Sequence, residues 1–384
     1  MTRFSIPLLC ATAAWTLVLA GCNKEAKPAT EPAAAPAATG DPAAPPAGAP
    51  TAAAAAPAAP TALPVFSLAW SEYPSWSTFG VAHELGLLDG KEGAQGEIEK
   101  RFQVDIVLRQ ADYDPCIAMY ASGQVDAAAL TNMDALNPAL GRPSVAILPT
   151  SRSHGADALL VPKDITDVEQ LKGKKVYGLE KSVSQYLFER ALQELGKNPA
   201  DFTFANMDPA AAATAMQQKS ADHSAIVVWN PFVLSTLAAR PDVHVLVDST
   251  KIPGEIVDLI IVAQASLDKP GGDAFAKAVA ATFYEVSRRI ENPGTRNATL
   301  VELGRKFSSL NAQQMETVVG QTQFYKTPED AKALFNGPEL VAVMAKVVAF
   351  CEARGVVTGK PSVAFGPKDK APPGTHLRFD PSYL

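Results

Sequence analysis

The sequence predicts an α/β protein in which parallel sheets are covered by helices. Two observations lead to this fold class. Short apolar segments typical of buried strands alternate along the chain with longer segments whose apolar residues recur at helical spacing. The chain is also 384 residues long, which is enough for two lobes of ordinary domain size.

The first strand is expected at Val65–Trp70, which has the composition of a buried strand. The segment Trp76–Leu88 carries apolar side chains at helical spacing and ends at Asp89-Gly90, a typical turn. Pro115 opens another helix, because the missing N–H of proline loses no partner in a first turn. The other elements expected in this part are strands 103–108, 125–130 and 145–148 and a short helix 134–140.

The same alternation repeats in the middle of the chain, and this repetition favours parallel sheets. Strands are expected at 175–179, 202–205, 225–229 and 256–262, and helices at 184–195, 209–218 and 231–239. After residue 262 the predicted elements are all helices, at 273–290, 295–307 and 338–354. The tail 361–384 is rich in Pro and Gly, and we expect it to be irregular.

The segment before these elements has a different composition. Between Pro28 and Ala62, Ala and Pro make up 27 of 35 residues, and no residue is aromatic. Such a segment cannot bury enough apolar surface to offset the entropy lost on ordering it. We therefore predict a disordered linker over residues 23–63 and a folded part that starts at residue 64.

The N-terminus resembles the signal peptide of a bacterial lipoprotein. Arg3 precedes the apolar stretch Ile6–Leu19, and Leu19-Ala20-Gly21-Cys22 resembles a lipobox. The resemblance implies a signal peptide over residues 1–22, lipidation (palmitate) at Cys22, and a periplasmic protein held at a membrane through its lipid only. An ordinary cleaved signal with an incidental cysteine is the alternative. Asn23 favours the outer membrane by resemblance to Gram-negative sorting, although the sequence leaves open which membrane holds the anchor.

Charge and motif content exclude several classes of function. The net charge is −6 and no run of Lys or Arg occurs, which argues against a nucleic-acid partner. The five histidines show no metal-ligand spacing, and the sequence has no phosphate loop or nucleophile elbow. We therefore expect no metal, no cofactor and no catalytic residue. The sequence leaves open whether Cys116 and Cys351 form a disulfide.

Polar and aromatic residues gather instead in loops that follow predicted strands. Ligands of open parallel sheets bind beyond the carboxyl ends of the strands. Aromatic faces, hydroxyl groups, an amide and a carboxylate at such ends are typical of a small-molecule pocket. The segments concerned are 70–76, 131–134, 151–155, 181–184 and 229–232.

Each of these segments also has a purely structural interpretation. Trp70 and Trp229 can be core residues, and Asp134 can be an acidic residue in the first turn of a helix. Ser182 and Ser184 stand at a helix start, where free N–H groups suit an anion. A serine at that place is also an ordinary N-cap.

Five segments in order resemble the periplasmic solute-binding proteins of ABC importers, in the branch for nitrate, taurine and alkanesulfonates, with thiamine-pyrimidine-binding relatives. They are Trp76–Gly86, Ser122–Leu136, Gly155–Val161, Leu171–Val176 and Val228–Phe232, and with the strands between them they cover most of Val65–Asp268. The resemblance implies the two-lobe periplasmic-binding-protein fold of type II, with the ligand cleft between the lobes. It implies a monomer with lobe 1 at 64–160 and 257–384 and lobe 2 at 161–256.

On the family pattern, the loops that face the cleft select ten ligand-binding residues. They are Trp70, Tyr73, Trp76, Asn132, Asp134, Ser153, Ser182, Ser184, Trp229 and Asn230. The chain departs from the pattern at Asp89–Phe102, where an extra amphipathic helix is expected. The three aromatic residues in the first loop suit a planar or cationic group better than nitrate. The expected ligand is therefore zwitterionic, sulfonate-like or heterocyclic.

The function implied by this resemblance is capture of a small solute and its delivery to an ABC permease and ATPase complex. Binding is expected to shift an open–closed equilibrium, and the closed form is expected to dock on the importer. Two alternatives remain open. One is a lipid-anchored sensor or interaction protein on the same fold, with a receptor as its partner. The other is an enzyme like the pyrimidine-synthesis relatives, whose cysteine-rich motif this chain lacks.

Overall fold

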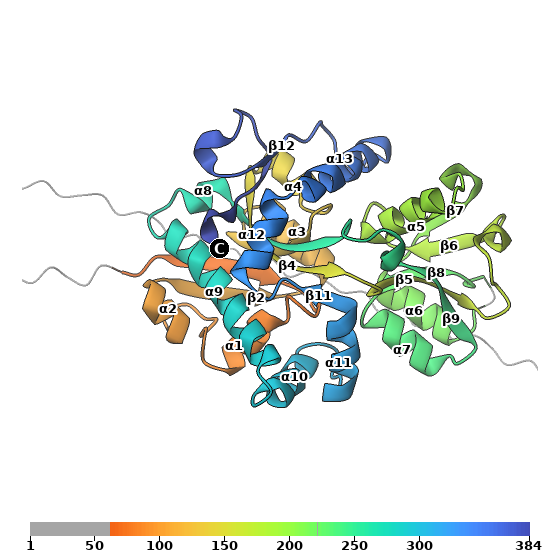
Figure 1. Cartoon of the computed structure of the whole chain (residues 1–384), viewed down its shortest axis with the longest axis horizontal. Coiled ribbons are helices and arrows are strands. Elements are labelled where there is room, and N and C mark those ends of the chain that lie inside the picture. Colours follow the sequence, from red (N-terminus) through yellow and green to blue (C-terminus); the bar gives the residue numbers. More distant parts are fainter. Residues whose placement is uncertain (1–61, 221) are drawn as a thin grey trace, which may run out of the picture. The chain divides into compact units, whose positions relative to one another are not determined.

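The computed structural model describes residues 62–220 and 222–384 (Figure 1). The predicted signal peptide 1–22, the predicted lipidation site Cys22 and nearly all of the predicted linker 23–63 lie outside these residues. The described chain forms two sheets with helices packed on them, all within one compact unit. This arrangement is the predicted α/β class.

The first sheet has eight strands in the order β12-β13-β4-β10-β3-β1-β2, with β11 paired on β4. Strand β1 pairs in parallel with both β2 and β3, whereas β10 runs antiparallel between β3 and β4. The strands are β1 (Val65–Trp70), β2 (Asp105–Gln110), β3 (Ala127–Thr131), β4 (Ser144–Ser153), β10 (Val257–Ala263), β11 (Thr322–Phe324), β12 (Val363–Phe365) and β13 (Leu377–Phe379).

The second sheet has five strands in the order β7-β6-β8-β5-β9. Strand β6 pairs in parallel with β7 and β8, and β5 runs antiparallel to β8 and β9. The strands are β5 (Asp157–Pro162), β6 (Lys175–Gly178), β7 (Thr203–Asn206), β8 (Ile226–Trp229) and β9 (Val243–Asp248).

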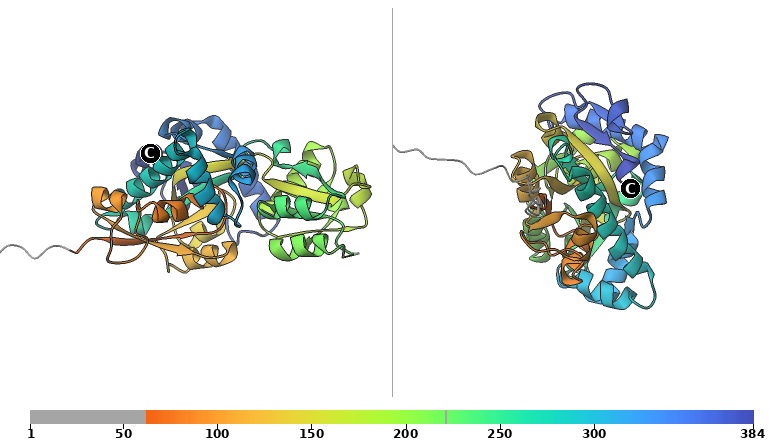
Figure 2. Two further views of the ribbon diagram at one scale, coloured as in Figure 1. Left: turned by 90° about the horizontal axis from the view of Figure 1, so that it is seen from below. Right: turned by 90° about the vertical axis from the view of Figure 1, so that its left-hand side faces the viewer.

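The helices pack on the faces of the two sheets (Figures 1 and 2). They are α1 (Thr78–Glu84), α2 (Glu97–Phe102), α3 (Tyr113–Ala121), α4 (Leu136–Gly141), α5 (Val183–Glu194), α6 (Pro209–Gln217), α7 (Phe232–Ala239), α8 (Gln264–Leu267), α9 (Gly272–Glu291), α10 (Arg296–Arg305), α11 (Ala312–Gln321), α12 (Pro328–Asn336) and α13 (Pro338–Ala353). In the part of the chain that the structure describes, no single helix is long and apolar enough to cross a membrane. The adjoining pair α12 and α13 meets that test only when taken together, and it is bent by 61°.

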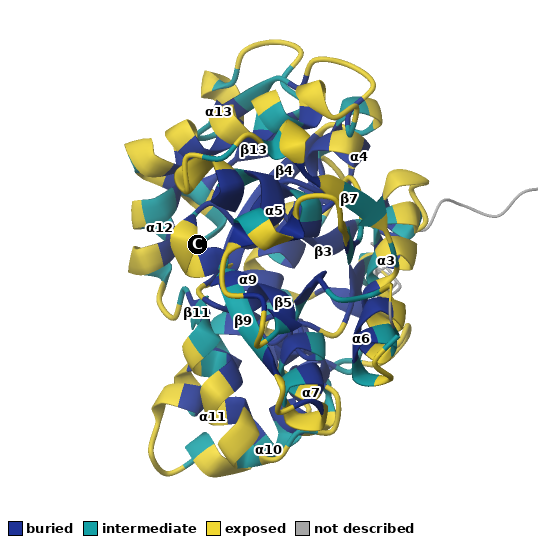
Figure 3. Ribbon diagram, turned by 90° about the vertical axis from the view of Figure 1, so that its right-hand side faces the viewer, coloured by how far each residue is buried: buried dark blue, intermediate teal, exposed yellow. Residues whose placement is uncertain are grey.

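Strand β10 explains why the first sheet is buried on both faces. Successive side chains of a strand point to opposite faces. Leu259 and Ile261 accordingly join one apolar cluster, while Ile260 and Val262 join another. The first of these clusters continues into the second sheet through residues such as Val227. In Figure 3 the buried residues therefore follow the strands and the inward faces of the helices.

The prediction that the sheets are parallel was only partly correct. Each sheet contains an antiparallel strand, β10 in the first and β5 in the second. The chain leaves the first sheet between β4 and β5 and returns between β9 and β10. Strand β5 begins at Asp157, so the chain enters the second sheet a few residues before the boundary expected at 160/161.

The prediction of an irregular tail and an all-helical C-terminal part was wrong. Strand β11 pairs with β4, and β13 extends the edge of the first sheet with β12 beside it. Each of these three strands is three residues long. A period-two pattern cannot be recognised over so few residues. Their pairing makes them strands, β11 and β13 with β4 and β12 with β13.

Two predicted helices are shorter than expected. The helix expected over Trp76–Leu88 is confined to Thr78–Glu84, because Leu85 caps it and Gly86 follows with a φ of 70°. The amphipathic helix expected within Asp89–Phe102 covers only Glu97–Phe102. Sequence reasoning also missed β9, α11 and α12 and did not assign the segment of β5 as a strand.

Candidate ligand-binding site

A cavity of about 560 Å³ lies where loops from both sheets meet. From the first sheet, its walls come from the segments that follow β1, β2 and β3. From the second sheet, they come from the segments that follow β6, β7 and β8. In each set the three strands run parallel, so their carboxyl ends share one edge of the sheet. The cavity therefore stands where ligands of open α/β sheets bind.

A row of aromatic rings runs along the wall of the cavity. Trp76 is tilted against Tyr73 at a centroid distance of 4.9 Å and stacked on Tyr113 at 5.5 Å. Tyr113 meets Trp229 edge to face at 6.2 Å, and Trp229 meets Phe232 at 6.1 Å. The contact between Tyr113 and Trp229 joins the first-sheet side of the cavity to the second-sheet side.

The polar part of the cavity wall is acidic. Seven carboxylate residues line it, and its described lining includes no Lys, Arg or His. The seven are Glu72, Asp112, Asp114, Asp134, Asp157, Asp208 and Asp258. Three of them are buried, because Asp134, Asp157 and Asp258 are 8%, 4% and 1% exposed. We call these three the buried acid cluster.

Asp134 is held in place by two hydroxyl groups. The hydroxyl groups of Tyr113 and Thr131 each donate to its Oδ2 at 2.8 Å. Burial raises the pKa of Asp134 to about 6, although these two hydrogen bonds act in the opposite direction. Burial also raises the pKa of Tyr113 well above its usual value, and Asp134 adds to that effect. The phenol of Tyr113 therefore remains neutral.

The other two members of the buried acid cluster have few partners. Asp157 begins β5, and its Oδ2 has no hydrogen-bond partner. Burial raises the pKa of Asp157 to about 6, and Asp134 adds to the shift. Asp258 accepts a hydrogen bond from the Ser151 hydroxyl. Burial raises the pKa of Asp258 well above its usual value, and Asp157 adds to the shift.

Half of the ten sequence-predicted residues line the cavity. These are Tyr73, Trp76, Asp134, Ser182 and Trp229. Asp134 precedes α4, whose first residue is Leu136, so it does not occupy the first helical turn that was its alternative interpretation. Trp229 is half-buried and belongs to the row of aromatic rings.

The start of α5 has the alternative role that the sequence suggested for it. The Ser182 hydroxyl accepts from the backbone N–H of Ser184 at 3.1 Å and donates to the backbone oxygen of Leu179 at 2.8 Å. Ser182 is thus the N-cap of α5. Ser184 is buried in the first turn and does not line the cavity.

Trp70 and Asn132 are not part of the cavity wall either. Trp70 is 2% exposed in the apolar core, where its ring packs so closely on α1 that a Cβ at Gly80 would lie 2.8 Å from it. The side chain of Asn132 bonds to the backbone. Its Nδ2 donates to the backbone oxygen of Glu255 at 3.1 Å, and its Oδ1 accepts from the N–H of Val257 at 3.1 Å.

Ser153 and Asn230 likewise make internal hydrogen bonds. The Ser153 hydroxyl accepts from the backbone N–H of Asp157 at 3.2 Å and lies 2.8 Å from the Ser249 hydroxyl. Asn230 donates from Nδ2 to Gln321 at 2.8 Å. Asn132 and Asn230 follow strands as predicted and Ser153 ends β4, but their side chains bond to backbone groups or neighbouring loops.

Sequence reasoning missed several residues of the cavity wall. Tyr113 follows β2 between two aspartates, and this Asp-Tyr-Asp segment after a strand was the signal that could have identified it. Asp258 was identifiable as an acidic residue inside an apolar strand. Asp157 had no comparable signal, because its position depends on the antiparallel strand β5 that was not assigned.

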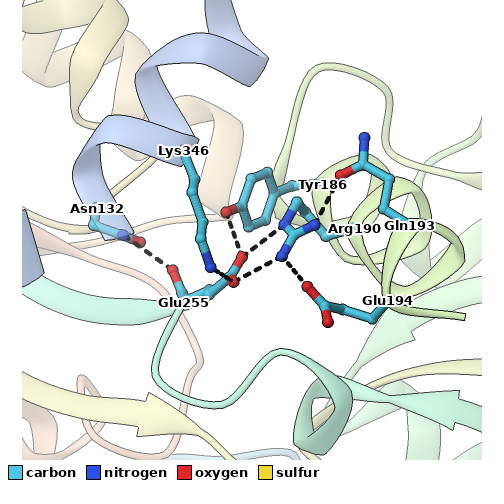
Figure 4. A network of polar contacts seen from close by, with 7 residues as sticks. All are labelled: Asn132, Tyr186, Arg190, Gln193, Glu194, Glu255 and Lys346. Atoms are coloured by element: carbon cyan, nitrogen blue, oxygen red, sulfur yellow. Dashed lines mark hydrogen bonds and ion pairs between the residues drawn. The ribbon is translucent and has the colours of Figure 1, made fainter. Parts of the chain in front are cut away.

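A second polar cluster joins the two sheets beside the cavity (Figure 4). The carboxylate of Glu255 accepts from Arg190 at 3.0 Å and from the Tyr186 hydroxyl at 2.7 Å, both on α5. Lys346 on α13 donates to it at 2.6 Å, while Asn132 donates to the backbone oxygen of Glu255. Burial alone would raise the pKa of Glu255, but these hydrogen bonds outweigh it and lower the pKa to about 2. We call this group the Glu255 cluster.

Other reactive groups give no further site within the described chain. Among residues 62–220 and 222–384, no group of three or more His, Cys, Asp or Glu residues is arranged to hold a metal ion. Cys116 and Cys351 are both buried and free, so the disulfide left open by the sequence is not formed. Burial raises the pKa of the Cys116 thiol to about 11, which keeps it protonated.

Comparison with known proteins places this geometry in a family. The sequence profile described as NMT1/THI5 like matches residues 101–294, and no curated protein sequence matches the chain. The periplasmic aliphatic sulphonate binding protein SsuA from Escherichia coli superposes with a TM-score of 0.60 at 20% identity, over 77% of this chain and 89% of that one. The alkanesulfonate-binding protein SsuA from Xanthomonas axonopodis pv. citri, bound to MOPS, superposes with a TM-score of 0.60 at 16% identity. The match covers 78% of this chain and 96% of that one.

A third solved structure shows the same fold. The Candida albicans CA3427 gene product, which exhibits the generic periplasmic binding protein fold, gives a TM-score of 0.55 at 14% identity, over 77% of this chain and 92% of that one. At these identities the structural matches establish the fold. The returning strand β10 lies between β3 and β4 in the first sheet, and the cavity lies between the two sheets. The chain therefore has the predicted periplasmic-binding-protein fold of type II and belongs to the NMT1/THI5-like family.

Proposed function

We propose that this protein is a periplasmic solute-binding protein that captures a small organic molecule and delivers it to an ABC importer. The observation that carries the proposal is the cavity itself. It joins the strand ends of two sheets and combines a row of aromatic rings with buried carboxylates. Such a combination is typical of a pocket that orients a small guest through a few polar groups.

The residues proposed to hold the solute come from both sheets. Tyr73, Trp76 and Asp134 follow strands of the first sheet, whereas Ser182 follows β6 and Trp229 ends β8 in the second. Tyr113, Asp157 and Asp258 complete the wall. A solute that contacts both sets favours the closed arrangement of two lobes, one built on each sheet, because it stabilises that arrangement more than an open one.

The structural relatives support the transport role and give less guidance on the ligand. Two of them are named as sulphonate- or alkanesulfonate-binding proteins. A sulfonate is an anion, and the cavity here carries seven carboxylate residues without a basic residue in its described lining. Like charges at short range repel, so a sulfonate is a poor ligand for this wall.

We further propose that Cys22 is lipidated and that the Ala- and Pro-rich segment after it tethers the binding domain to a membrane. The support comes from Leu19-Ala20-Gly21-Cys22 and from the composition between Pro28 and Ala62. Proline-rich chain extends by ~3.1 Å per residue, so a linker of ~40 residues reaches at most on the order of 120 Å. Such a tether allows the domain to dock on an importer while anchored.

A binding role fits the cavity better than an enzymatic one. Its described lining contains no Cys, His or Lys that could serve as nucleophile or as base for a serine. Two of its three buried carboxylates, Asp134 and Asp258, accept hydrogen bonds from hydroxyl groups. Capture of a solute therefore requires only the groups that the cavity wall already contains.

Transport measurements test the proposal directly. Deleting the gene should abolish uptake of one radiolabelled solute from a panel of amines, amino acids, sulfonates and pyrimidines, and a plasmid copy should restore it. Cys22→Ala should remove labelling by palmitate and release the protein from the membrane. Unchanged uptake of every solute, together with a response of a sensor pathway to the same solutes, would contradict the importer role and favour a receptor partner.

A further inference from the structure

We propose that the solute is an organic cation, an amine whose ammonium group binds at the buried acid cluster. Its hydrocarbon part would lie against the rings of Trp76, Tyr113 and Trp229. This inference rests on the proposed solute-binding function and specifies the chemical class of the ligand. It replaces the zwitterionic, sulfonate-like or heterocyclic ligand expected from the sequence.

The first argument is the balance of charge around the cavity. The buried acid cluster draws Asp134 from the segment after β3, Asp157 from β5 and Asp258 from β10, so both sheets contribute. No Lys, Arg or His is among the described residues that line the cavity, so none of them pairs with these three carboxyl groups. Buried carboxylates in proteins are normally paired with a positive group. A cationic guest would supply the missing partner.

The second argument is an unused hydrogen-bond acceptor. Asp157 lines the cavity and is 4% exposed, yet its Oδ2 has no hydrogen-bond partner. A buried acceptor without a partner is costly and is rare in native proteins. An ammonium group carries several N–H donors and can satisfy this oxygen. A sulfonate or nitrate carries only acceptors and cannot.

The third argument is the aromatic wall. The faces of Trp and Tyr rings attract cations, and this attraction grows when the cation is removed from water. Trp76 and Tyr113 stack with an interplanar angle of 14°, and Trp229 closes the row from the second sheet. Rings beside carboxylates suit a guest with an ammonium head and an alkyl chain. A hydrated inorganic cation would gain little from the rings.

The N-terminus of α5 does not favour an anion in the cavity. The first free N–H groups of α5 are one feature of the cavity that could attract an anion, beside the unpartnered donors of Tyr73 and Trp76. The Ser182 hydroxyl already accepts from the N–H of Ser184 at 3.1 Å. Asp208 caps α6 in the same way at 3.0 Å and brings another negative charge to that side of the cavity.

Calorimetry with the purified full chain tests the proposal. The probes are 1,4-diaminobutane, spermidine and choline as cations, with taurine and ethanesulfonate as sulfonates. We expect at least one amine to bind tenfold or more tightly than either sulfonate. Tighter binding of a sulfonate would overturn the cationic ligand and leave the importer role standing. Failure of both amines, 1,4-diaminobutane and spermidine, would overturn it as well, whereas only the uptake experiment bears on the importer role.

A pair of variants separates recognition from folding. Asp157→Asn removes one buried charge at constant shape, and Asp369→Asn removes an exposed charge on a residue that does not line the cavity. We expect Asp157→Asn to weaken amine binding at least tenfold without lowering the Tm of the empty protein, and Asp369→Asn to change neither. Amine binding that survives in Asp157→Asn would contradict the proposal. So would a lower Tm with unchanged amine affinity, because Asp157 would then have a structural role only.

Discussion

The ring of Tyr113 meets the ring of Trp229 edge to face, with a centroid distance of 6.2 Å, at the cavity between the two sheets. The hydroxyl group of the same tyrosine donates to Asp134 at 2.8 Å. Tyr113 thus connects the aromatic wall to the buried acid cluster. Tyr113 and Asp134 follow strands of the first sheet, whereas Trp229 ends β8 of the second, so a solute bound against these rings would contact both sides of the cavity together.

Trp229→Ala tests the role of the aromatic wall. We expect this change to weaken amine binding about 30-fold, which corresponds to a loss of ~2 kcal/mol for a desolvated cation–ring contact. Trp229 is only half-buried, so the fold should persist. Calorimetry measures the affinity and circular dichroism the folding.

Trp70→Ala is the matched control for that experiment. Trp70 is buried in the core against α1, and its removal should lower the free energy of unfolding by about 3–5 kcal/mol. Amine affinity of the folded fraction should change little. If Trp229→Ala unfolds the protein as Trp70→Ala does, Trp229 is a core residue and the cavity wall was misassigned.

The affinity for amines should depend on pH. The pKa values of Asp134 and Asp157 are raised to about 6, so both are mainly ionised at pH 7.5 and protonated at pH 5. A cation binds their ionised forms, and affinity should therefore fall as pH falls through about 6, by up to about tenfold per pH unit for each proton displaced. Calorimetry at pH 5, 6, 7 and 8 measures this dependence.

The titratable groups near the buried acid cluster determine which protonation steps the pH dependence of amine binding can report. Tyr73 and Tyr113 face the buried acid cluster, and both have pKa values raised well above their usual value, so they stay neutral over this range. Burial raises the pKa of Asp114, and that of Asp258 lies well above its ordinary value. An affinity that rises as pH falls from 7 to 5 would be incompatible with a cationic guest.

The same two aspartates should also affect the stability of the empty protein. Their folded-state pKa values lie above the unfolded value, so the folded state binds more protons between about pH 4 and pH 6. Their contribution to stability therefore decreases as pH rises through this window. Urea unfolding of the wild type and of Asp134→Asn/Asp157→Asn should show this slope only in the wild type. An equal slope in both would mean that the two residues titrate normally.

Several parts of the site could be predicted from the sequence because strand ends were recognisable. Trp76 and Asp134 follow clear apolar strands, and ligand sites of open sheets lie beyond such ends. The same rule selected Asn132, whose side chain instead bonds to the backbone around Glu255. A strand end indicates where a residue lies, whereas the direction of its side chain depends on long-range contacts that no local pattern contains.

The acidic character of the cavity was less accessible from the sequence. Asp157 and Asp258 belong to antiparallel strands, and an α/β alternation predicts only the parallel ones. The two residues are 101 positions apart, yet each contributes to the raised pKa of Tyr73. The strand that carries Asp258 was predicted, but its proximity to Asp157 follows only once β5 and β10 are placed in the sheets.

Asp208 and Asp114 provide a test of how many positive charges the solute carries. Asp208 is the N-cap of α6, Asp114 lies in the first turn of α3, and Asp208 contributes to the raised pKa of Asp114. They form a second, exposed acidic group on the cavity wall. Asp208→Asn keeps an N-cap and removes one charge. We expect this change to weaken the binding of spermidine and 1,4-diaminobutane about three- to tenfold more than the binding of choline. Equal effects on the binding of all three would contradict a second cationic contact.

The Glu255 cluster should determine how firmly the two sheets are joined. Glu255 is 4% exposed and pairs with Arg190 on α5 and Lys346 on α13. Glu255→Gln leaves these cations without their buried partner, and the free energy of unfolding should fall by about 3 kcal/mol. This value is at the low end for a broken buried pair, because Arg190 keeps its contact with Glu194 at 2.5 Å. Urea unfolding at pH 7 measures the loss.

Two comparisons decide whether that loss comes from the buried charge of Glu255. Glu285→Gln breaks the surface pairs of α9 with Arg288 and Arg289 and should cost less than about 1 kcal/mol. The pKa of Glu255 is lowered to about 2, so its stabilising effect is complete above the unfolded value of about 4.3 and is lost as pH falls toward 2. The difference between wild type and Glu255→Gln should therefore be smaller at pH 3 than at pH 7. A difference that stays constant over this range would show that shape rather than charge at residue 255 joins the sheets.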